Sequence, residues 1–295
     1  MVPGASTRPA DWRKRLEGLV PTAVEARRVL VAGCGSVGSF MAGELARVGV
    51  RRFTLVDPDV VEWANLTRTA YLHRDLGRGK VEALADHLRS VFPDVEVEAR
   101  QAAVQDLGDG FRGLLEAADL VISAVDQPAA HGRINRLAYA AGKAALFVGL
   151  YRGAKGGEII ATLPGRTPCF HCSTGGVRRV AEDEGAGAVV RTQRDYGTNR
   201  LVAEVALGSD IHFVCCAGVK VALSLLSAGS GGGLEHFLGR QLEEGGNFLM
   251  LGMEPDYYLF PSTHASAVGQ YAFQSLWLST TSAPDCEVCG PARGR

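Results

Sequence analysis

An apolar segment near the start of the chain, residues 29–32, runs directly into a loop of closely spaced glycines. Glycines allow a backbone to approach a phosphate group, and a helix that begins in such a loop favours the phosphate's negative charge. The loop supplies four candidate nucleotide-binding residues: Gly33, Gly35, Ser36 and Gly38. A loop of this kind predicts nucleotide binding but leaves the reaction open, since nicotinamide-dependent oxidoreductases use the same turn.

Acidic, amide and basic side chains follow the glycine loop at short intervals. Asp57 and Asp59 come at the end of a second apolar segment, and an Asn-x-x-Arg pattern, Asn65 and Arg68, comes shortly after them. An acid about 20 residues beyond a glycine loop suits hydrogen bonding to a ribose hydroxyl, which is the role we expect for Asp57. Together, the loop, the paired acids and the Asn-x-x-Arg pattern point to adenylation of a carboxylate by ATP.

Four of the seven cysteines form two C-x-x-C pairs, Cys169 with Cys172 and Cys286 with Cys289. Four thiolates are enough for a closed tetrahedral zinc site, which would fasten the end of the chain to its middle. The alternatives are free thiols or a redox dithiol, although a thioredoxin-like setting for a redox pair is absent. The remaining cysteines are Cys34, in the glycine loop, and Cys215 and Cys216, in an apolar segment where buried thiols are common.

The segments that carry these residues alternate between strand and helix patterns over the first 150 residues. Apolar segments predict strands at 28–32, 52–56, 95–99, 120–124 and 145–149. Helices are predicted at 36–48, 80–91 and 134–141, and residues 114–118 are expected to close a further helix. This order predicts an α/β fold with a doubly wound, mostly parallel (Rossmann-like) sheet covered on both faces. Ligands of such sheets bind beyond the carboxyl ends of the strands, where the glycine loop, Asp57 and Asp126 all fall.

Composition and changes in the residue pattern predict three regions along the chain. Residues 1–27 are expected to be a helical N-terminal segment with a helix at 11–19, and residues 28–175 the nucleotide-binding core. Residues 176–295 are expected to be a zinc-stapled extension that packs as one unit with the core. Its parts are a long polar loop (173–200), a helix (207–226), a flexible Ser/Gly break (227–233) and short strands. The turn at 153–157 predicts that the strand after it lies at a sheet edge.

Residues 33–80 resemble the ThiF/MoeB/HesA family of ubiquitin-activating (E1-like) adenylyltransferases, and the likeness extends over roughly residues 28–175. The matching pattern is the glycine loop, the Asp-x-Asp-x-Val-Glu run from Asp57, Asn-x-x-Arg, and Gly79-Lys80 before a helix. Ser123-Ala124-Val125-Asp126 continues the match, and the placement of the cysteine pairs agrees with the family. Three departures mark a divergent branch: Thr69 where relatives often have Gln, Gln127 where they have Asn, and His131 where they have Arg.

The resemblance implies roles for the charged residues. When a carboxylate attacks the α-phosphate of ATP, two anions meet, so cations must neutralise the charge. Arg68 and Lys80 are the candidates, and Asp126 is the expected Mg²⁺ ligand because magnesium prefers hard oxygen donors. Asp57 would hold the ribose and Asn65 would orient a phosphate. Relatives often supply a further arginine from an N-terminal helix, a role for which Arg13 and Arg15 are both open.

The resemblance also implies a substrate: a ubiquitin-like or sulfur-carrier protein whose glycine C-terminus is adenylated with release of pyrophosphate. Residues 173–214 contain no cysteine, so we expect the acyl-adenylate to pass directly to a sulfur donor or a conjugating partner. A peptide or a tRNA-linked carboxylate is the alternative within the same chemistry. A non-catalytic scaffold and a nicotinamide oxidoreductase are the alternatives outside it. Relatives usually dimerise, so a homodimer is expected.

Bulk composition narrows the class of protein. A net charge of −1 gives no support for binding nucleic acid or an anionic membrane. The first residues have no apolar core of the secretory-signal type, and no run approaches the roughly 18–20 apolar residues of a membrane span. We therefore expect a cytoplasmic protein that uses ATP, Mg²⁺ and Zn²⁺.

Overall fold

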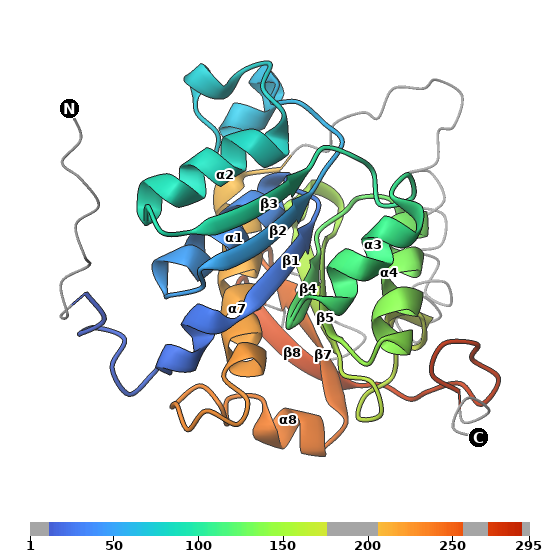
Figure 1. The fold of residues 1–295 in the computed structure, drawn as a ribbon. Coiled ribbons are helices and arrows are strands. Elements are labelled where there is room, and N and C mark those ends of the chain that lie inside the picture. The colour runs from blue at the N-terminus through green and yellow to red at the C-terminus, as the bar shows by residue number, and fades with distance from the viewer. Residues whose placement is uncertain (1–11, 176–205, 256–270, 291–295) are drawn as a thin grey trace, which may run out of the picture.

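An eight-stranded mixed sheet organises the molecule, in a computed structural model that describes residues 12–175, 206–255 and 271–290 (Figure 1). The strand order is β3-β2-β1-β4-β5-β6-β7-β8. Five strands run parallel: β1 (Arg28–Ala32), β2 (Arg52–Val56), β3 (Glu96–Arg100), β4 (Leu120–Ser123) and β5 (Ala144–Leu150). Three antiparallel strands extend the sheet: β6 (Gly156–Thr162), β7 (Gly246–Gly252) and β8 (Gln274–Ser279). The α/β Rossmann-like class predicted from the sequence is confirmed.

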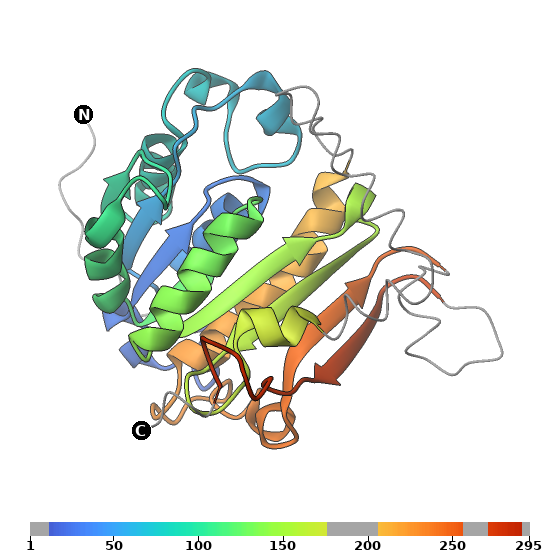
Figure 2. The ribbon, with the colours of Figure 1, turned by 90° about the vertical axis from the view of Figure 1, so that its right-hand side faces the viewer.

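Helices cover both faces of the sheet, as Figures 1 and 2 show. One face carries α1 (Ser36–Arg47), α2 (Lys80–Val91) and α7 (Gly208–Leu226), whose apolar residues join those of the strands in one core. A second core lies on the opposite face, under α3 (Gly108–Glu116) and α4 (Pro128–Ala140). Shorter helices are η1 (Thr22–Ala26), η2 (Trp63–Thr67), η3 (His73–Asp75), η4 (Arg152–Ala154) and α8 (Gly239–Glu243).

The expected bounds of β1, β2 and α2 agree with the structure. The predicted start of α4 does not. This helix begins at Pro128, before the predicted start at residue 134. The sequence there lacks a periodic apolar pattern, but proline at the first helical position has a suitable φ and no N–H to satisfy. The early start brings α4 close behind Asp126.

The prediction of an edge strand after residue 157 is wrong, because β6 lies between β5 and β7. Every residue of β7 is buried. The continuous apolar run Phe248–Met250 is typical of a strand buried on both faces. As a buried strand between β6 and β8, β7 continues the sheet and its core beyond the five parallel strands.

Two segments differ in structure from what the sequence suggested: residues 11–19, expected to be a helix, and residues 227–233, expected to be a flexible break. Residues 12–19 form turns rather than a helix, held where the Arg51 guanidinium lies 4.9 Å from the Trp12 ring and 4.0 Å from the Phe92 ring. The Ser/Gly break at 227–233 forms hydrogen bonds with a following side chain. The Glu235 carboxylate accepts N–H groups of Gly229 (2.8 Å) and Gly231 (2.5 Å), both at positive φ.

Helix α7 is long and apolar enough to cross a membrane by length and composition, with a mean hydropathy of 1.5. Its packing explains the apolar composition without a membrane. Of its most apolar 18-residue stretch 56% is buried within the fold, and the helix packs against α1, β5 and β6. Apolar residues on most sides of a helix are typical of a core helix.

Candidate functional site

The glycine loop lies at the carboxyl end of β1, where the strand order reverses between β1 and β4. Gly33 has a φ of +90°, and a Cβ there would lie 2.4 Å from the carbonyl oxygen of Ala124. A Cβ on Gly38 would lie 1.8 Å from the carbonyl oxygen of Gly33. Neither position admits a side chain, so the loop packs directly against α1 and against the segment that leads to Asp126. Helix α1 begins after Gly35, which has no side chain to cap it, as in helices that bind phosphate with their first N–H groups.

Asp57 holds the glycine loop from the end of β2. Its Oδ2 accepts the Cys34 N–H at 2.6 Å, and its Oδ1 accepts the Asp59 N–H at 2.9 Å. The carboxyl group is buried, and burial raises its pKa, although Lys80 and the two N–H groups act in the opposite direction. The structure therefore shows Asp57 fixing the loop, while its contact with a ribose stays a prediction.

Lys80 and Asp59, both predicted to contact the nucleotide, form an ion pair. The Lys80 Nζ lies 2.7 Å from the Asp59 Oδ2. Lys80 is the first residue of α2 and is buried, whereas the Asp59 side chain is 61% exposed. The buried ammonium group is thus paired with a solvent-exposed carboxylate, at the carboxyl ends of the parallel strands, where the glycine loop also lies.

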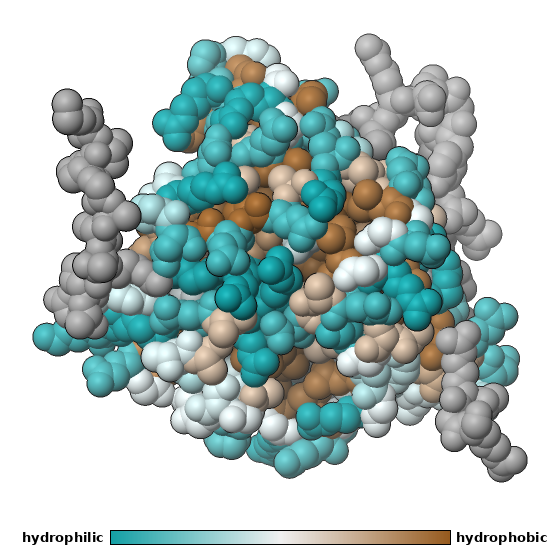
Figure 3. Space-filling view, in the orientation of Figure 1, coloured by the Kyte–Doolittle hydropathy of each residue, from teal (hydrophilic) through white to brown (hydrophobic). Residues whose placement is uncertain are grey.

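Asn65 and Arg68 lie on the segment between β2 and α2, which projects beyond the carboxyl edge of the sheet (Figure 1). Hydrophilic residues predominate on this segment, at the top of Figure 3. The Asn65 Oδ1 accepts the Glu62 N–H at 2.9 Å and so caps η2. Arg68 ends η2, and the start of α7 packs against its backbone. Asn65 thus has a structural role that its spacing did not reveal.

Asp126 is exposed and lies just beyond the end of β4, beside the glycine loop. A side chain that was noted only as a departure from relatives, His131, lies close by. Its Nδ1 is 2.8 Å from the Ser123 Oγ, and its ring stacks on Phe170 with centroids 5.2 Å apart. His131 therefore links the end of β4 to the segment of the first cysteine pair.

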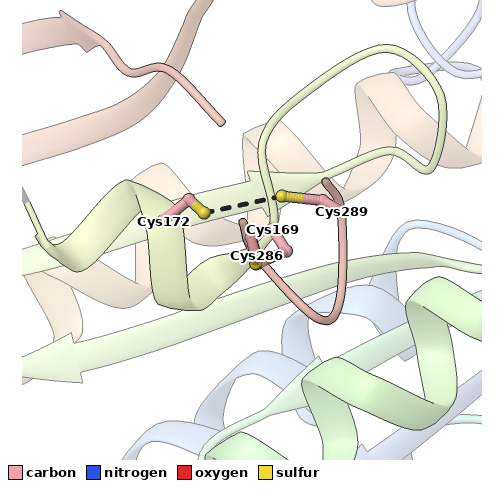
Figure 4. Close-up of side chains that lie close together, drawn as sticks. All are labelled: Cys169, Cys172, Cys286 and Cys289. Carbon is pink, nitrogen blue, oxygen red and sulfur yellow. Dashed lines mark hydrogen bonds between the residues drawn. The ribbon is translucent and has the colours of Figure 1, made fainter. Parts of the chain in front are cut away.

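The two C-x-x-C pairs converge although 117 residues separate their members (Figure 4). Their four Sγ atoms lie within 4.8 Å of one another, with Cys169–Cys286 at 3.8 Å and Cys172–Cys289 at 3.5 Å. Sulfurs bound tetrahedrally at about 2.3 Å from zinc are about 3.8 Å apart, so the donor set fits zinc in both chemistry and spacing. The predicted four-cysteine cluster is present and could hold the metal.

The thiols of the cluster differ in acidity. Burial raises the pKa of Cys169 to about 11. Cys286 is also partly buried, but N–H groups of Cys289 and Val288 and the thiols of the first pair lower its pKa to about 7. A bound cation would favour the thiolate at every one of these positions.

A buried polar network supports the cluster, and sequence reasoning missed it. Asn247, in β7, is fully buried and donates to the Ser173 Oγ at 2.9 Å, while its Oδ1 accepts the Thr280 hydroxyl at 2.6 Å. Ser173 directly follows the first cysteine pair, and Thr280 precedes the second. An asparagine immediately before a continuous apolar run was the available signal, since buried amides need partners.

Two of the other cysteines are buried away from any substrate, and the two N-terminal arginines differ in their surroundings. Cys34 and Cys215 are buried, and burial raises the pKa of each thiol above its ordinary value. Arg13 bonds to Glu25 at 2.8 Å, which ties it to the chain's own N-terminal segment, and Arg15 is exposed. The polar loop expected at 173–200 lies almost entirely outside the described residues.

Comparison with known proteins agrees with this geometry. The profile of the ThiF family matches residues 20–246. Ubiquitin-like modifier-activating enzyme 5 of Xenopus laevis is 36% identical over 156 residues, which cover 49% of this chain and 39% of that protein. The enzyme of the same name from Dictyostelium discoideum is 31% identical over 154 residues, covering 49% and 40%. The chain thus spans about two fifths of the length of these curated relatives.

Solved structures share the fold over a longer stretch. Escherichia coli MccB with ATP superposes with a TM-score of 0.63 and 16% identity, covering 91% of this chain and 68% of that one. The complex of MccB with AMPCPP and MccA gives the same values. At this identity the likeness establishes the fold alone.

Proposed function

The chain belongs to the ThiF family, and from that premise we propose that it uses ATP to adenylate the C-terminal carboxylate of a ubiquitin-like or sulfur-carrier protein, releasing pyrophosphate. One observation carries the proposal. The glycine loop follows β1 and exposed Asp126 follows β4, on the two sides of the point where the strand order reverses, and the Lys80–Asp59 pair adjoins Asp57, which holds the loop. Open α/β sheets bind their ligands in the crevice at such a point.

Each group suits one part of the reaction. The first N–H groups of α1 would bind phosphate, with Asp57 near the ribose and Asn65 near a phosphate. Lys80 would leave Asp59 for the more highly charged phosphate chain, and Arg68 would neutralise the charge that develops as carboxylate and phosphate meet. Asp126 would hold Mg²⁺, whose role is to offset phosphate charge. Zinc in the four-cysteine cluster would serve structure, since a closed site of four thiolates leaves no position for a substrate.

The proposed partner follows from the relatives' names. Those sequences belong to ubiquitin-like modifier-activating enzymes, which favours a protein carrier with a glycine C-terminus. MccB, described as a microcin C7 biosynthetic enzyme, has been solved with N-formylated MccA, which keeps a substrate of the MccA kind as the second candidate. We further propose a cytoplasmic homodimer, to be tested by its mass in solution.

The test is ATP–pyrophosphate exchange with and without ubiquitin-like proteins that end in Gly-Gly. We expect carrier-dependent exchange that falls at least about a hundredfold in Asp126→Ala, because removing a transition-state interaction typically costs about 2.7 kcal/mol or more. Asp109→Ala removes an exposed acid from the first turn of α3 and should exchange normally. Absence of exchange with every carrier, while ATP still raises the melting temperature, would favour the MccA-like substrate. Absence of ATP binding would leave a non-catalytic scaffold.

A further inference from the structure

A buried tyrosine, Tyr71, joins segments that carry the proposed nucleotide-binding residues. Its side chain is 3% exposed, and its hydroxyl donates to the Cys34 carbonyl oxygen at 2.6 Å. The same hydroxyl lies 3.2 Å from the carbonyl oxygen of Lys80. One atom therefore contacts both the glycine loop and the first residue of α2.

The contact completes a clamp on the loop. The Cys34 N–H donates to Asp57, and the Cys34 carbonyl accepts from Tyr71. Both backbone groups of one loop residue are thus held by buried side chains from two different segments. The clamp sits directly before Gly35, where α1 and its phosphate-binding N–H groups begin.

The segment that carries Tyr71 is itself fixed and leads back to Arg68. The Ala70 N–H donates to the Ser39 Oγ of α1 at 3.2 Å, and the Thr69 hydroxyl donates to the Asn65 carbonyl oxygen at 2.8 Å. Arg68 immediately precedes these residues. The position of Tyr71 consequently helps to fix the positions of the glycine loop, Arg68 and Lys80 relative to one another.

Packing alone does not account for the hydroxyl. The ring lies in the core formed by the sheet with α1, α2 and α7, where phenylalanine would bury the same apolar surface. Burying a hydroxyl is unfavourable unless it is hydrogen-bonded, so its bonds to the loop and to α2 are the property that distinguishes tyrosine at this position.

We propose that Tyr71 is a positioning residue for ATP: its hydroxyl fixes the glycine loop against the start of α2, so that the loop N–H groups and Lys80 bind one phosphate chain together. The inference rests on the proposed adenylation and adds a residue to it. Small displacements of positioned groups are costly, since binding and chemistry both depend on geometry within about 1 Å.

The test compares Tyr71→Phe with Tyr139→Phe. Tyr139 also donates its hydroxyl to a backbone carbonyl, that of Thr167 at 2.7 Å, but lies on α4. For Tyr71→Phe we expect the Kd and KM for ATP to rise about tenfold, equivalent to one lost hydrogen bond and a carbonyl left without its donor. The KM for the carrier should not change. Tyr139→Phe should lower the melting temperature comparably and leave the ATP constants at wild-type values.

Ser39→Ala provides a second, milder variant, because it removes only the acceptor that holds residue 70. We expect the KM for ATP to rise about threefold, in proportion to a weaker contact. Wild-type ATP constants in both variants, with exchange intact in the unaltered protein, would overturn the role of Tyr71 alone. Failure of the unaltered protein to bind ATP would overturn the proposed function and the inference together.

Discussion

The proposed nucleotide-binding edge, where the glycine loop, Asp57, Asp59 and Lys80 lie at the carboxyl ends of the parallel strands, and the cysteine cluster are built in opposite ways. At the edge, the polar groups come from neighbouring segments and are already partnered: Lys80 with Asp59, and Asp57 with two backbone N–H groups. In the cluster, four thiols from distant segments face one another, with sulfur–sulfur distances of 3.5 and 3.8 Å across the two pairs. The polar groups of the edge are thus paired with one another, whereas the cluster brings together four metal-ligand groups of a single kind.

This difference indicates how each region would respond to its ligand. Thiolates held that close repel one another, so a cation would stabilise the cluster directly and couple metal binding to folding. The edge needs no ligand to remain ordered, because its charges are compensated. Under the proposed function, a nucleotide would compete there with existing partners, and Lys80 would exchange Asp59 for phosphate.

The largest expected effect comes from breaking the cluster. Cys289→Ser should abolish stoichiometric zinc binding, measured by elemental analysis, and lower the free energy of unfolding by about 4 kcal/mol or more. Cys216→Ser is the matched control, since this thiol is exposed on α7 and lies outside the cluster. Absence of zinc from both variants would show that the cysteines converge without binding a metal, and equal zinc in both would show that Cys289 is not a ligand.

The edge should respond in activity rather than in stability. Lys80→Met keeps the length of the side chain and removes its charge, and we expect exchange to fall about a hundredfold. Asp59→Asn keeps the shape of the partner, whose side chain is mostly exposed, and should change exchange by less than about tenfold. A larger loss in Asp59→Asn than in Lys80→Met would mean that the carboxylate, and not the ammonium group, acts on the nucleotide.

The placement of part of this edge was predictable from the sequence because its geometry is local. The glycine loop, Asp57 and Asp126 each follow a strand within a few residues, and parallel strands bring their carboxyl ends to one side of the sheet. Convergence of the two cysteine pairs was predictable for a different reason, since the chemistry of four thiols favours a common metal ion. The bounds of β1, β2 and α2 followed from apolar periodicity.

Side-chain pairing and strand order in the second half were beyond the sequence. That Lys80 meets Asp59, or that Tyr71 meets Cys34, depends on how the loop between β2 and α2 folds back. The position of β6 inside the sheet depends on its pairing with β7, although β6 ends at Thr162 and β7 begins only at Gly246. No local pattern in these two strands encodes their pairing.

The supports of the cluster offer an intermediate effect. Asn247→Ala removes bonds to Ser173, Thr280 and the Ala161 carbonyl and leaves the two hydroxyls only their contact with each other at 3.1 Å, so we expect a loss of about 2–3 kcal/mol in the free energy of unfolding. Ser279→Ala, which removes one exposed bond to the Glu244 carbonyl, should cost less than about 0.5 kcal/mol. Denaturant titration measures both. If the network also positions the cysteines, Asn247→Ala will weaken zinc binding as well.

The smallest effect concerns pH and the contact between two helices of the core. His212, on α7, stacks on Phe40 of α1 with centroids 4.0 Å apart. Burial lowers the pKa of His212 from its ordinary value of 6.5, although Glu44 acts in the opposite direction. Since the folded state then binds fewer protons than the unfolded state, the contribution of His212 to stability is present above pH 6.5 and is lost as the pH falls through its lowered pKa.

His212→Gln should therefore flatten the fall in melting temperature between about pH 6.5 and 5, because that fall reflects the difference in bound protons between the folded and unfolded states. His87 on α2, whose pKa burial also lowers, is the matched site, and His87→Gln should flatten the profile independently. The two changes should add, because the residues lie on different helices. At each pH the zinc content should be the same in both variants as in the unaltered chain, which separates the helix contact from the cluster. An unchanged slope in His212→Gln would mean that the ring titrates alike in the folded and unfolded chain.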